Sequence, residues 1–316
     1  MSERLRHPLQ LPVGNAICYS GYRRGQSPET RVYPSPAEIR DDLALLARHW
    51  RVLRLYDSGV HAERVLEAIR AGDLDLKVLL GAHLGAELNN FGCPWGGTYA
   101  PEVLEGNRRA NDAELERLVT LARRYEDLVF AVAVGNEATV DWTDHYVPVP
   151  RMLELVRRAK AGVTQPVTVC DNHVPWLHHL RELAEELDFI SLHTYPVWEY
   201  KHVHEAIHCT MDNYEGVARL YPGKPVVITE AGWATSSNGR GIDPANSSEE
   251  WQAIYYQDLM DWTGAQGILT FVFEAFDEPW KGSSDPLEPE KHWGLFTVDR
   301  RPKLAMRALY PDLQSR

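Results

Sequence analysis

The stretch Pro225-Val-Val-Ile-Thr-Glu-Ala-Gly-Trp233 runs four residues that favour β-structure directly into a carboxylate. An apolar run without alternation is typical of a strand buried on both faces, as strands are in a parallel sheet. A glutamate at the end of such a strand is costly to bury, so its presence needs a reason. An ion pair that fixes a loop is the structural explanation. A second stretch of the same design, Val129-Phe-Ala-Val-Ala-Val-Gly-Asn-Glu137, favours instead a shared chemical role for Glu230 and Glu137.

The bulk composition restricts the class of protein. A chain of 316 residues is long enough for one large α/β barrel or for two ordinary domains. Its 44% hydrophobic and 25% charged residues are typical of a globular protein with ample core material. The formal net charge of −12 argues against nucleic acid or an anionic membrane as a partner. No stretch approaches the ~18 consecutive apolar residues of a membrane-spanning helix.

The N-terminus and the cysteines bear on the cellular compartment. Residues 1–10 carry positive charge without a following apolar segment, which does not match a secretory signal. The cysteines are scattered without a CxxC spacing, and Cys18 and Cys170 lie in apolar runs where they predict core packing. Without a disulfide framework, the expected location is the cytoplasm. If the chain is part of a longer one, the periplasm or the exterior is the alternative.

Strand-like and helix-like segments alternate along the whole chain. The capping box Ser35-Pro-Ala-Glu38, with proline at the first helical position, predicts a helix start, and Ser247-Ser-Glu-Glu250 predicts another. A long connection rich in Gly, Asn and Pro is expected over 83–111. The expected strands cover 13–19, 51–56, 76–82, 129–135, 166–170, 189–193, 225–231 and 267–273. The expected helices cover 36–47, 65–72, 112–125, 151–161, 177–187, 212–220, 248–262 and 304–309.

Eight strand–helix repeats without a linker predict one α/β domain over 1–316. The expected architecture is a closed (β/α)8 TIM barrel with long βα loops at its C-terminal face. A doubly wound open sheet is the alternative, but no glycine-rich phosphate turn follows the first strand. In a barrel the chemistry lies at the C-terminal ends of the strands, which is where Glu137 and Glu230 fall. A carboxylate pair roughly 5 Å apart suits retaining glycoside hydrolysis.

Several neighbours of the two glutamates are expected to assist them. Asn136 offers an amide that can hold a sugar hydroxyl. Arg54 and Tyr56 share one face of the second strand, so their charge and hydroxyl are expected to keep one glutamate ionised. An ordinary ion pair of Arg54 with Asp57 or Glu87 is the alternative.

Aromatic residues crowd the strand ends and loops, and sugar rings stack on such faces. They are Tyr19, Trp95, Trp142, Trp176, Tyr195, Trp198, Trp233 and Trp280. Any one of them could serve packing alone, but as a group they favour a carbohydrate ligand. His204 and His208 stand four residues apart, yet no third metal ligand accompanies them, so we expect a solvated histidine face and neither metal nor cofactor.

After the eighth strand, the stretch 273–281 adds Glu274, Glu278 and Lys281. The strand-end location predicts contact with substrate hydroxyls or with Glu230. A surface pair between Lys281 and Glu278 is the structural alternative.

These residues form an ordered set of motifs that resembles glycoside hydrolase family 17, the β-1,3-glucanase family. The resemblance covers nearly the whole chain. The motifs are Cys18-Tyr19, Arg54-Leu-Tyr-Asp57, Val134-Gly-Asn-Glu137, Thr229-Glu-Ala-Gly-Trp233, Phe276-Asp-Glu-Pro-Trp-Lys281 and His292-Trp-Gly-Leu-Phe296.

The resemblance implies that Glu137 is the general acid/base and Glu230 the nucleophile. Departures from the plant pattern are Glu274, Asp277 and Ala231, together with the segments 89–99 and 280–292. The plant enzymes' open cleft and internal cleavage therefore do not carry over. The chain is more similar to bacterial-type members, which include exo-acting enzymes and transglycosylases.

The predicted function is a retaining glycoside hydrolase that acts on β-1,3-glucan or its oligosaccharides. The alternative is an enzyme that mainly transfers glucanosyl units, and a less favoured one is a carbohydrate-binding barrel without catalysis. The residues expected to contact substrate are Tyr19, Arg54, Tyr56, Asn136, Tyr195, Trp233, Glu274, Glu278 and Lys281.

Overall fold

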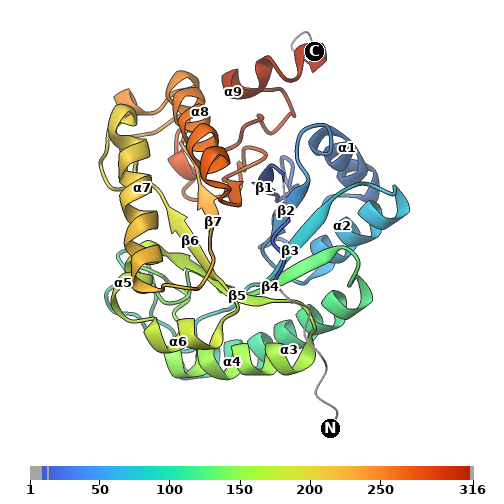
Figure 1. Ribbon diagram of the computed structural model, residues 1–316, viewed down its shortest axis with the longest axis vertical. Coiled ribbons are helices and arrows are strands. Elements are labelled where there is room, and N and C mark those ends of the chain that lie inside the picture. Colours follow the sequence, from blue (N-terminus) through green and yellow to red (C-terminus); the bar gives the residue numbers. More distant parts are fainter. Residues whose placement is uncertain (1–8, 13, 314–316) are drawn as a thin grey trace.

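The computed structural model describes residues 9–12 and 14–313, which contain a closed barrel of eight parallel strands paired in chain order (Figure 1). The strands are β1 (Ala16–Cys18), β2 (Val52–Leu55), β3 (Lys77–Ala82), β4 (Val129–Asn136), β5 (Val167–Asn172), β6 (Ile190–Thr194), β7 (Val226–Ala231) and β8 (Thr270–Val272). The barrel closes where Ala16 pairs with Phe271 and Ile17 with Val272. The predicted (β/α)8 architecture is confirmed.

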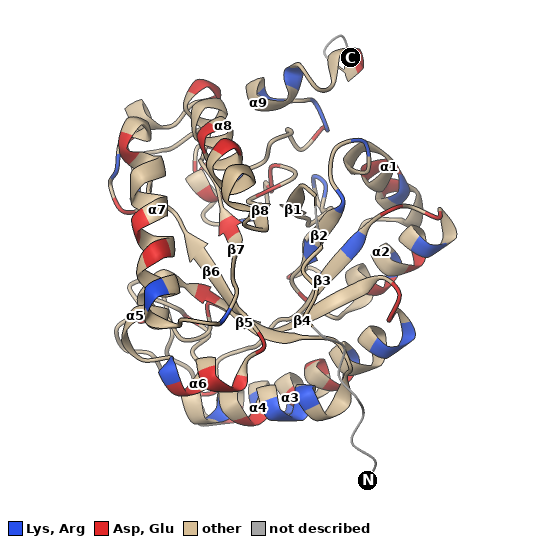
Figure 2. Ribbon diagram, in the orientation of Figure 1, with Lys and Arg blue, Asp and Glu red and all other residues tan. Residues whose placement is uncertain are grey.

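Helices surround the strands as an outer layer (Figure 1). The α-helices are α1 (Pro36–Leu46), α2 (Val60–Ala71), α3 (Pro101–Arg124), α4 (Val149–Gly162), α5 (His173–His178), α6 (Arg181–Glu186), α7 (Val203–Leu220), α8 (Glu249–Gln266) and α9 (Leu304–Arg307). The 3-10 turns are η1 (Pro244–Asn246), η2 (Pro289–Lys291) and η3 (Pro311–Leu313). Acidic and basic residues are mixed on α3 and α4, whereas the charged residues of α8 are acidic (Figure 2). None of the helices within the described residues is long and apolar enough to span a bilayer.

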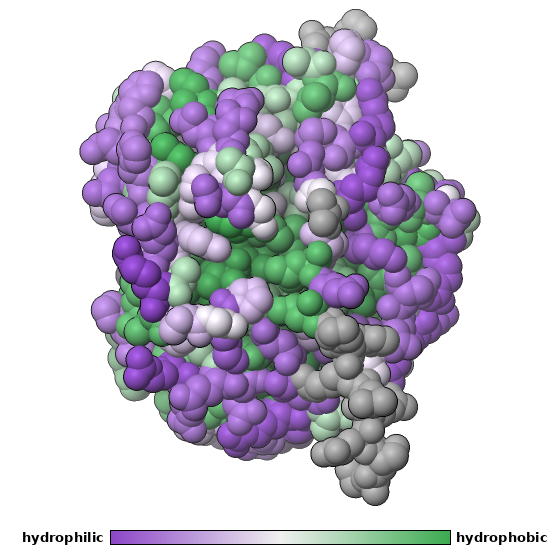
Figure 3. Space-filling view, in the orientation of Figure 1, coloured by the Kyte–Doolittle hydropathy of each residue, from purple (hydrophilic) through white to green (hydrophobic). Residues whose placement is uncertain are grey.

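The apolar strands are buried on both faces because the helices cover their outer side and packed side chains fill the barrel. Every residue of β5, β6 and β7 is buried. Figure 3 shows hydrophobic side chains at the centre of one face and hydrophilic ones around its rim. These runs have no alternation of apolar and polar residues, and the parallel sheet predicted from that pattern is confirmed.

Two loop and helix boundaries differ from expectation. The connection expected over 83–111 is shorter, because α3 begins at Pro101, with proline in its first turn. The first ten residues of this helix are mostly exposed and polar, so they lack the apolar periodicity that reveals a buried face. The helix expected over 177–187 is two short helices, α5 and α6.

Further boundaries shift for local reasons. Helix α7 begins at Val203 rather than near 212, since the His202 side chain accepts a hydrogen bond from the amide of His204. The last expected strand began at Gly267, but this residue ends α8 in the left-handed conformation, with φ 66°. The first expected strand began at Val13, which lies outside the described residues; β1 starts at Ala16.

The two predicted capping boxes have different outcomes. Ser35 accepts from the amide of Glu38, whose carboxylate accepts from the amide of Ser35, so this capping box is confirmed. In α8, however, the cap is Ser248, which accepts from the amide of Trp251. Ser247 instead donates to the carbonyl of Pro244 in the preceding turn.

Ser248→Ala is expected to lower the free energy of unfolding by about 1 kcal/mol, because the amide of Trp251 loses its acceptor. Ser247→Ala is the matched control and should change the free energy of unfolding by less than about 0.5 kcal/mol. Urea denaturation of the two variants measures both values. Equal losses, or a larger loss for Ser247→Ala, would contradict this assignment of the cap.

Candidate active site

The barrel brings the two glutamates of the opening motifs together at the C-terminal ends of their strands. Glu137 follows β4 directly and Glu230 is the fifth residue of β7. Nδ1 of His193, from β6, lies 3.0 Å from Oε1 of Glu137 and 3.5 Å from Oε2 of Glu230. Ligand atoms of these three side chains all lie within 4.8 Å of one another. The carboxylates are therefore close enough for double displacement at one anomeric carbon.

The chain leaves extended geometry just before the Glu137 side chain. Gly135 has φ 86°, and Glu137 itself has φ 45°, in the left-handed region that non-glycine residues rarely adopt. The amide of Glu137 donates to the carbonyl of Cys170 on β5, at 2.9 Å. This backbone turn aims the carboxylate across the barrel mouth, and such unusual conformations are concentrated at functional sites.

Glu230 lies in a nest of donors. Arg54 Nη1 lies 2.6 Å from Oε1, and the Tyr56 hydroxyl donates to the same oxygen at 2.9 Å. The Tyr195 hydroxyl donates to Oε2 at 2.6 Å. Burial alone would raise the pKa of Glu230, but the Nδ1–H of His193, the charge of Arg54 and the two hydroxyls outweigh it and lower the pKa to about 2. This carboxylate is thus held ionised, as a nucleophile requires.

Glu137 has a different environment. The Glu137 side chain is 26% exposed, whereas the Glu230 side chain is 7% exposed. Oε1 of Glu137 contacts the ring of His193, which lies between the two carboxylates. A carboxyl that exchanges protons with a leaving group and with water needs such access. The buried, ionised Glu230 therefore suits the predicted role of nucleophile, and the more exposed Glu137 suits the predicted role of acid/base.

Arg54 organises the floor of the site. Besides Glu230, it donates to the carbonyl of Thr229 at 2.9 Å and to Oδ1 of Asn136. Its alternative partners are engaged elsewhere, since Asp57 accepts from the amide of Gly59 and Glu87 pairs with Arg151. The interpretation of Arg54 as a partner of a catalytic carboxylate, rather than of a loop residue, agrees with these contacts.

His193 was not recognised from the sequence. It is fully buried, and its Nε2 lies 3.1 Å from Arg54 Nη1. Burial opposes a charge on His193 and the Glu230 carboxylate favours one, while the Arg54 guanidinium also opposes it. A guanidinium can only donate, so its contact opposes a second ring proton, and we assign the neutral ring with its proton on Nδ1. The sequence did hold one indication of a role for His193, because this residue lies at the end of the sixth expected strand, as the two glutamates lie at the ends of theirs.

The residues after β8 form a second charged cluster. Lys281 pairs with Glu278 and lies 3.3 Å from Oε2 of Glu274, and both carboxylates are buried. Burial, together with the charge of Glu278, raises the pKa of Glu274 well above its usual value. Lys281 is therefore part of a buried network and not of a surface pair. Trp280 donates from Nε1 to Oε1 of Glu278, at 3.2 Å.

A further carboxyl near both glutamates, Glu290, was also missed. Burial raises its pKa to about 7, with Lys281 acting in the opposite direction and the charges of Glu137 and Glu230 adding to the rise. Its position in the loop after β8, far from any strand end in sequence, gave no signal.

Two residues expected to bind substrate lie elsewhere. Tyr19 is buried, and its hydroxyl donates to Asp42. Trp233 is also buried, and its Nε1 donates to the carbonyl of Asn246. Tyr19 follows the last residue of β1 and contacts Asp42 of α1. Trp233 lies two residues beyond the end of β7 and contacts Tyr255 of α8, so both side chains face the helices. The proposed sugar contacts of Tyr19 and Trp233 were therefore wrong.

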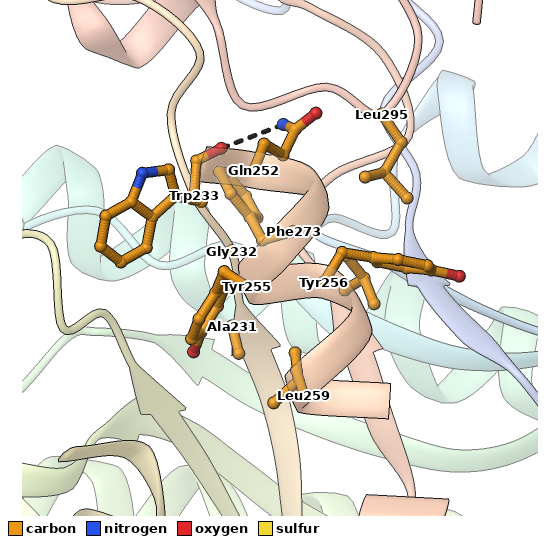
Figure 4. A pocket seen from close by; sticks show the side chains of 10 residues that line it. Ala231, Gly232, Trp233, Gln252, Tyr255, Tyr256, Leu259, Phe273 and Leu295 are labelled. Carbon is orange, nitrogen blue, oxygen red and sulfur yellow. Dashed lines mark hydrogen bonds between the residues drawn. The ribbon is translucent and has the colours of Figure 1, made fainter. Parts of the chain in front are cut away.

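Trp233 lines a small pocket between β7, β8 and α8, shown in Figure 4. Ala231 and Tyr255 also line it, and Gln252 donates to the carbonyl of Trp233. The pocket lies on the helix side of β7 and so is separate from the Glu230 carboxylate. It is a packing defect of the outer layer and not a substrate site.

Other aromatic residues divide between packing and exposure. Trp176 is buried and donates to the carbonyl of Ser191, so it serves packing. Tyr195 and Trp198 are half-buried beside Trp293. Trp95 is 57% exposed. The aromatic residues thus do not form one continuous sugar-binding rim.

Within the described residues, the group whose atoms approach metal-binding spacing is that of Glu137, His193 and Glu230. The Arg54 guanidinium, 2.6 Å from Glu230 Oε1, places a positive charge against it. A cation in this position would meet repulsion, so the group fits acid–base chemistry better than metal binding. His204 and His208 are exposed on α7 and are not part of it.

Comparison with known proteins finds a matching family profile and related glycosidases. The family profile of the BtgE/BtgC glycoside hydrolase domain matches residues 16–294. A glucan 1,3-beta-glucosidase of Arthroderma benhamiae is 25% identical over 84% of this chain and 83% of its own length. A probable beta-glucosidase btgE of Aspergillus fumigatus is 27% identical over 54% of this chain but only 30% of its own length. The chain thus spans most of the first relative and under a third of the second.

Solved structures agree with this fold. An endo-laminarinase from Formosa is 27% identical, with a TM-score of 0.78 over 95% of this chain and 87% of that one. A glycoside hydrolase family 17 beta-1,3-glucanosyltransferase from Rhizomucor miehei is 21% identical, with a TM-score of 0.72 over 92% of this chain and 96% of that one. The resemblance to family 17 is confirmed.

Tyr195→Phe is expected to shift the acid limb of kcat/KM to higher pH by about one unit, because Glu230 loses a hydrogen bond to its ionised form. The pH profile on laminari-oligosaccharides measures this shift. Tyr200→Phe, which changes an 83% exposed side chain, should leave the profile unchanged. An acid limb in Tyr195→Phe that coincides with the wild-type limb would contradict this role of Tyr195.

Proposed function

Since the chain belongs to the BtgE/BtgC glycoside hydrolase domain family, we propose that it cleaves β-1,3-glucan or its oligosaccharides with retention of anomeric configuration. The observation that carries this proposal is the pair of carboxylates, Glu137 and Glu230, whose oxygens lie within 4.8 Å of each other. Retaining enzymes need this spacing, whereas inverting enzymes need room for a water molecule between the two groups.

The substrate class comes from the relatives. One is named for glucan 1,3-beta-glucosidase activity and a structural neighbour for laminarinase activity. The acidic chain is consistent with a neutral polysaccharide, since it has no basic excess for a polyanion.

In the first step, a carboxylate oxygen of Glu230 attacks the anomeric carbon. The glycosidic C–O bond breaks, and the departing oxygen takes the proton of Glu137. Arg54, Tyr56 and Tyr195 keep Glu230 ionised until it attacks. The products are a glycosyl-enzyme ester, a released sugar with a free hydroxyl, and Glu137 as carboxylate.

In the second step, Glu137 removes a proton from water, whose oxygen attacks the same carbon. The ester bond to Glu230 breaks, and both carboxyl groups return to their initial states. A sugar hydroxyl can replace water here, and the product is then a longer oligosaccharide. We expect Asn136, whose Oδ1 accepts from Arg54, to bind a hydroxyl of the reacting sugar.

Glu230→Ala is expected to lower kcat/KM on laminari-oligosaccharides by about 10⁴-fold or more, and Glu137→Ala by about 10²- to 10⁴-fold. With azide and an activated aryl β-glycoside, Glu230→Ala should give the α-glycosyl azide and Glu137→Ala the β-glycosyl azide. NMR of the products distinguishes them. The matched control is Glu205→Gln, on the exposed face of α7. Wild-type activity in Glu230→Ala would refute the assignment.

Product sizing tests the second step. Laminari-oligosaccharides incubated with the wild-type protein should give shorter products through hydrolysis. If a sugar is the preferred acceptor, products longer than the substrate should appear early and then decline. A time course at several substrate concentrations measures the ratio, because transfer rises with acceptor concentration and hydrolysis does not. No change in product size at any time would contradict both forms of the proposal.

A further inference from the structure

We propose that His145 is a positioning residue for Glu137, and that its imidazolium form clamps the peptide group on which Glu137 is carried. The inference rests on the proposed function, in which Glu137 is the acid/base. It assigns a role to a residue that no strand-end motif contains.

The peptide group between Asn136 and Glu137 is held from both sides. Its carbonyl, at Asn136, lies 2.9 Å from Nε2 of His145. Its N–H, at Glu137, donates to the carbonyl of Cys170 at 2.9 Å. The orientation of this peptide sets the φ of 45° at Glu137, a conformation that a free chain would leave. The two bonds together fix the direction in which the carboxylate leaves the backbone.

The ring of His145 faces oxygen acceptors at both nitrogens. Nε2 faces the carbonyl of Asn136, which can only accept. Nδ1 lies 2.8 Å from Oδ1 of Asp144 and 3.0 Å from the hydroxyl of Thr143. A neutral imidazole has one N–H, whereas the carbonyl of Asn136 and the carboxylate of Asp144 need two N–H donors, one at each ring nitrogen. The geometry therefore selects the doubly protonated ring.

The charged groups around His145 support the same state. They are Asp144 in its own loop, Glu137 after β4 and His83 after β3, whose ring lies 5.6 Å from that of His145. Burial lowers the pKa of His145, but the bonds to Asp144 and to the Asn136 carbonyl outweigh it and raise the pKa above its usual value. The charge of His145 in turn lowers the pKa of His83, whose side chain is exposed.

The loop that presents His145 is anchored by the neighbouring loop. The Tyr99 hydroxyl donates to the carbonyl of Asp144 at 2.8 Å, and Asn90 Nδ2 donates to the carbonyl of Thr143 at 2.8 Å. The amide of Val147 donates to the carbonyl of Ala138, which closes the turn behind Glu137. His145 thus links two hydrogen-bonded loops to the backbone of the acid/base.

The first test compares leaving groups. A misplaced acid/base slows departure of a sugar alcohol but hardly affects dinitrophenolate, which leaves without a proton. His145→Ala should lower kcat/KM, which reports the first step, about 10- to 100-fold on laminari-oligosaccharides, with less than about 3-fold change in kcat/KM on a dinitrophenyl β-laminaribioside. His145→Gln, which keeps one donor toward the Asn136 carbonyl, should lose less. His208→Gln, on the exposed face of α7, is the control.

The second test reads the charge of His145 without using activity. In ¹⁵N-histidine-labelled protein at pH 7.5, one ring should have two imidazolium nitrogens that vanish in His145→Gln. Asp144→Asn should lower the pH at which these signals titrate. Above that pH the clamp loses one proton, so the leaving-group ratio of the wild type should approach that of His145→Gln.

Each outcome supports or overturns the proposal. Equal losses on both substrates, or a neutral His145 ring at pH 7.5, would overturn it. If His145→Ala unfolds, His145→Gln and the NMR titration answer the same question. Glu137→Gln, assayed in parallel, separates the two levels: if it also lacks the leaving-group effect, the assignment of Glu137 as acid/base has failed. If Glu137→Gln has the effect and the His145 variants do not, only this inference has failed.

Discussion

The buried guanidinium of Arg54 is the interaction on which the rest of the site depends. It is 2% exposed and reaches Glu230 and Thr229 on β7, His193 on β6 and Asn136 on β4. A charge buried in this way is tolerated only with a full set of acceptors, so the strands that supply them must keep their register. The same contacts that make Arg54 acceptable in the core hold the nucleophile ionised. Stability and chemistry therefore share one set of hydrogen bonds.

The sequence predicted the parts of the site that strand ends determine. Glu137, Glu230 and Tyr195 were recognisable because each follows an apolar run, and barrel closure does the remainder. Tyr19 and Trp233 occupy similar places in the sequence but face the helices. Both lie just beyond the last residue of their strand, β1 or β7, where the path of the following loop sets which way the side chain points. Aromatic character alone could not reveal that.

The missing parts of the site depend on loop conformation. His145 and Glu290 lie in loops whose paths follow from hydrogen bonds between distant segments, and no local pattern encodes those. The predicted start of α3 was wrong for a related reason. The first ten residues of this helix mostly face water, so they show no helical repeat of apolar residues. His193 is an intermediate case, because its place at the end of β6 was visible but its bridging role needed the distances to both glutamates.

The bonds from Asn90 and Tyr99 to the loop after β4 have an evolutionary consequence. An insertion or deletion between β3 and α3 would shift the loop after β4 through this contact and so displace the acid/base. This effect does not require any residue of that segment to contact a sugar. Divergence of the two loops is thus constrained to occur in concert. A chimera that exchanges one loop for that of a relative would inherit its length without its partner, whereas exchange of both loops keeps the contact intact.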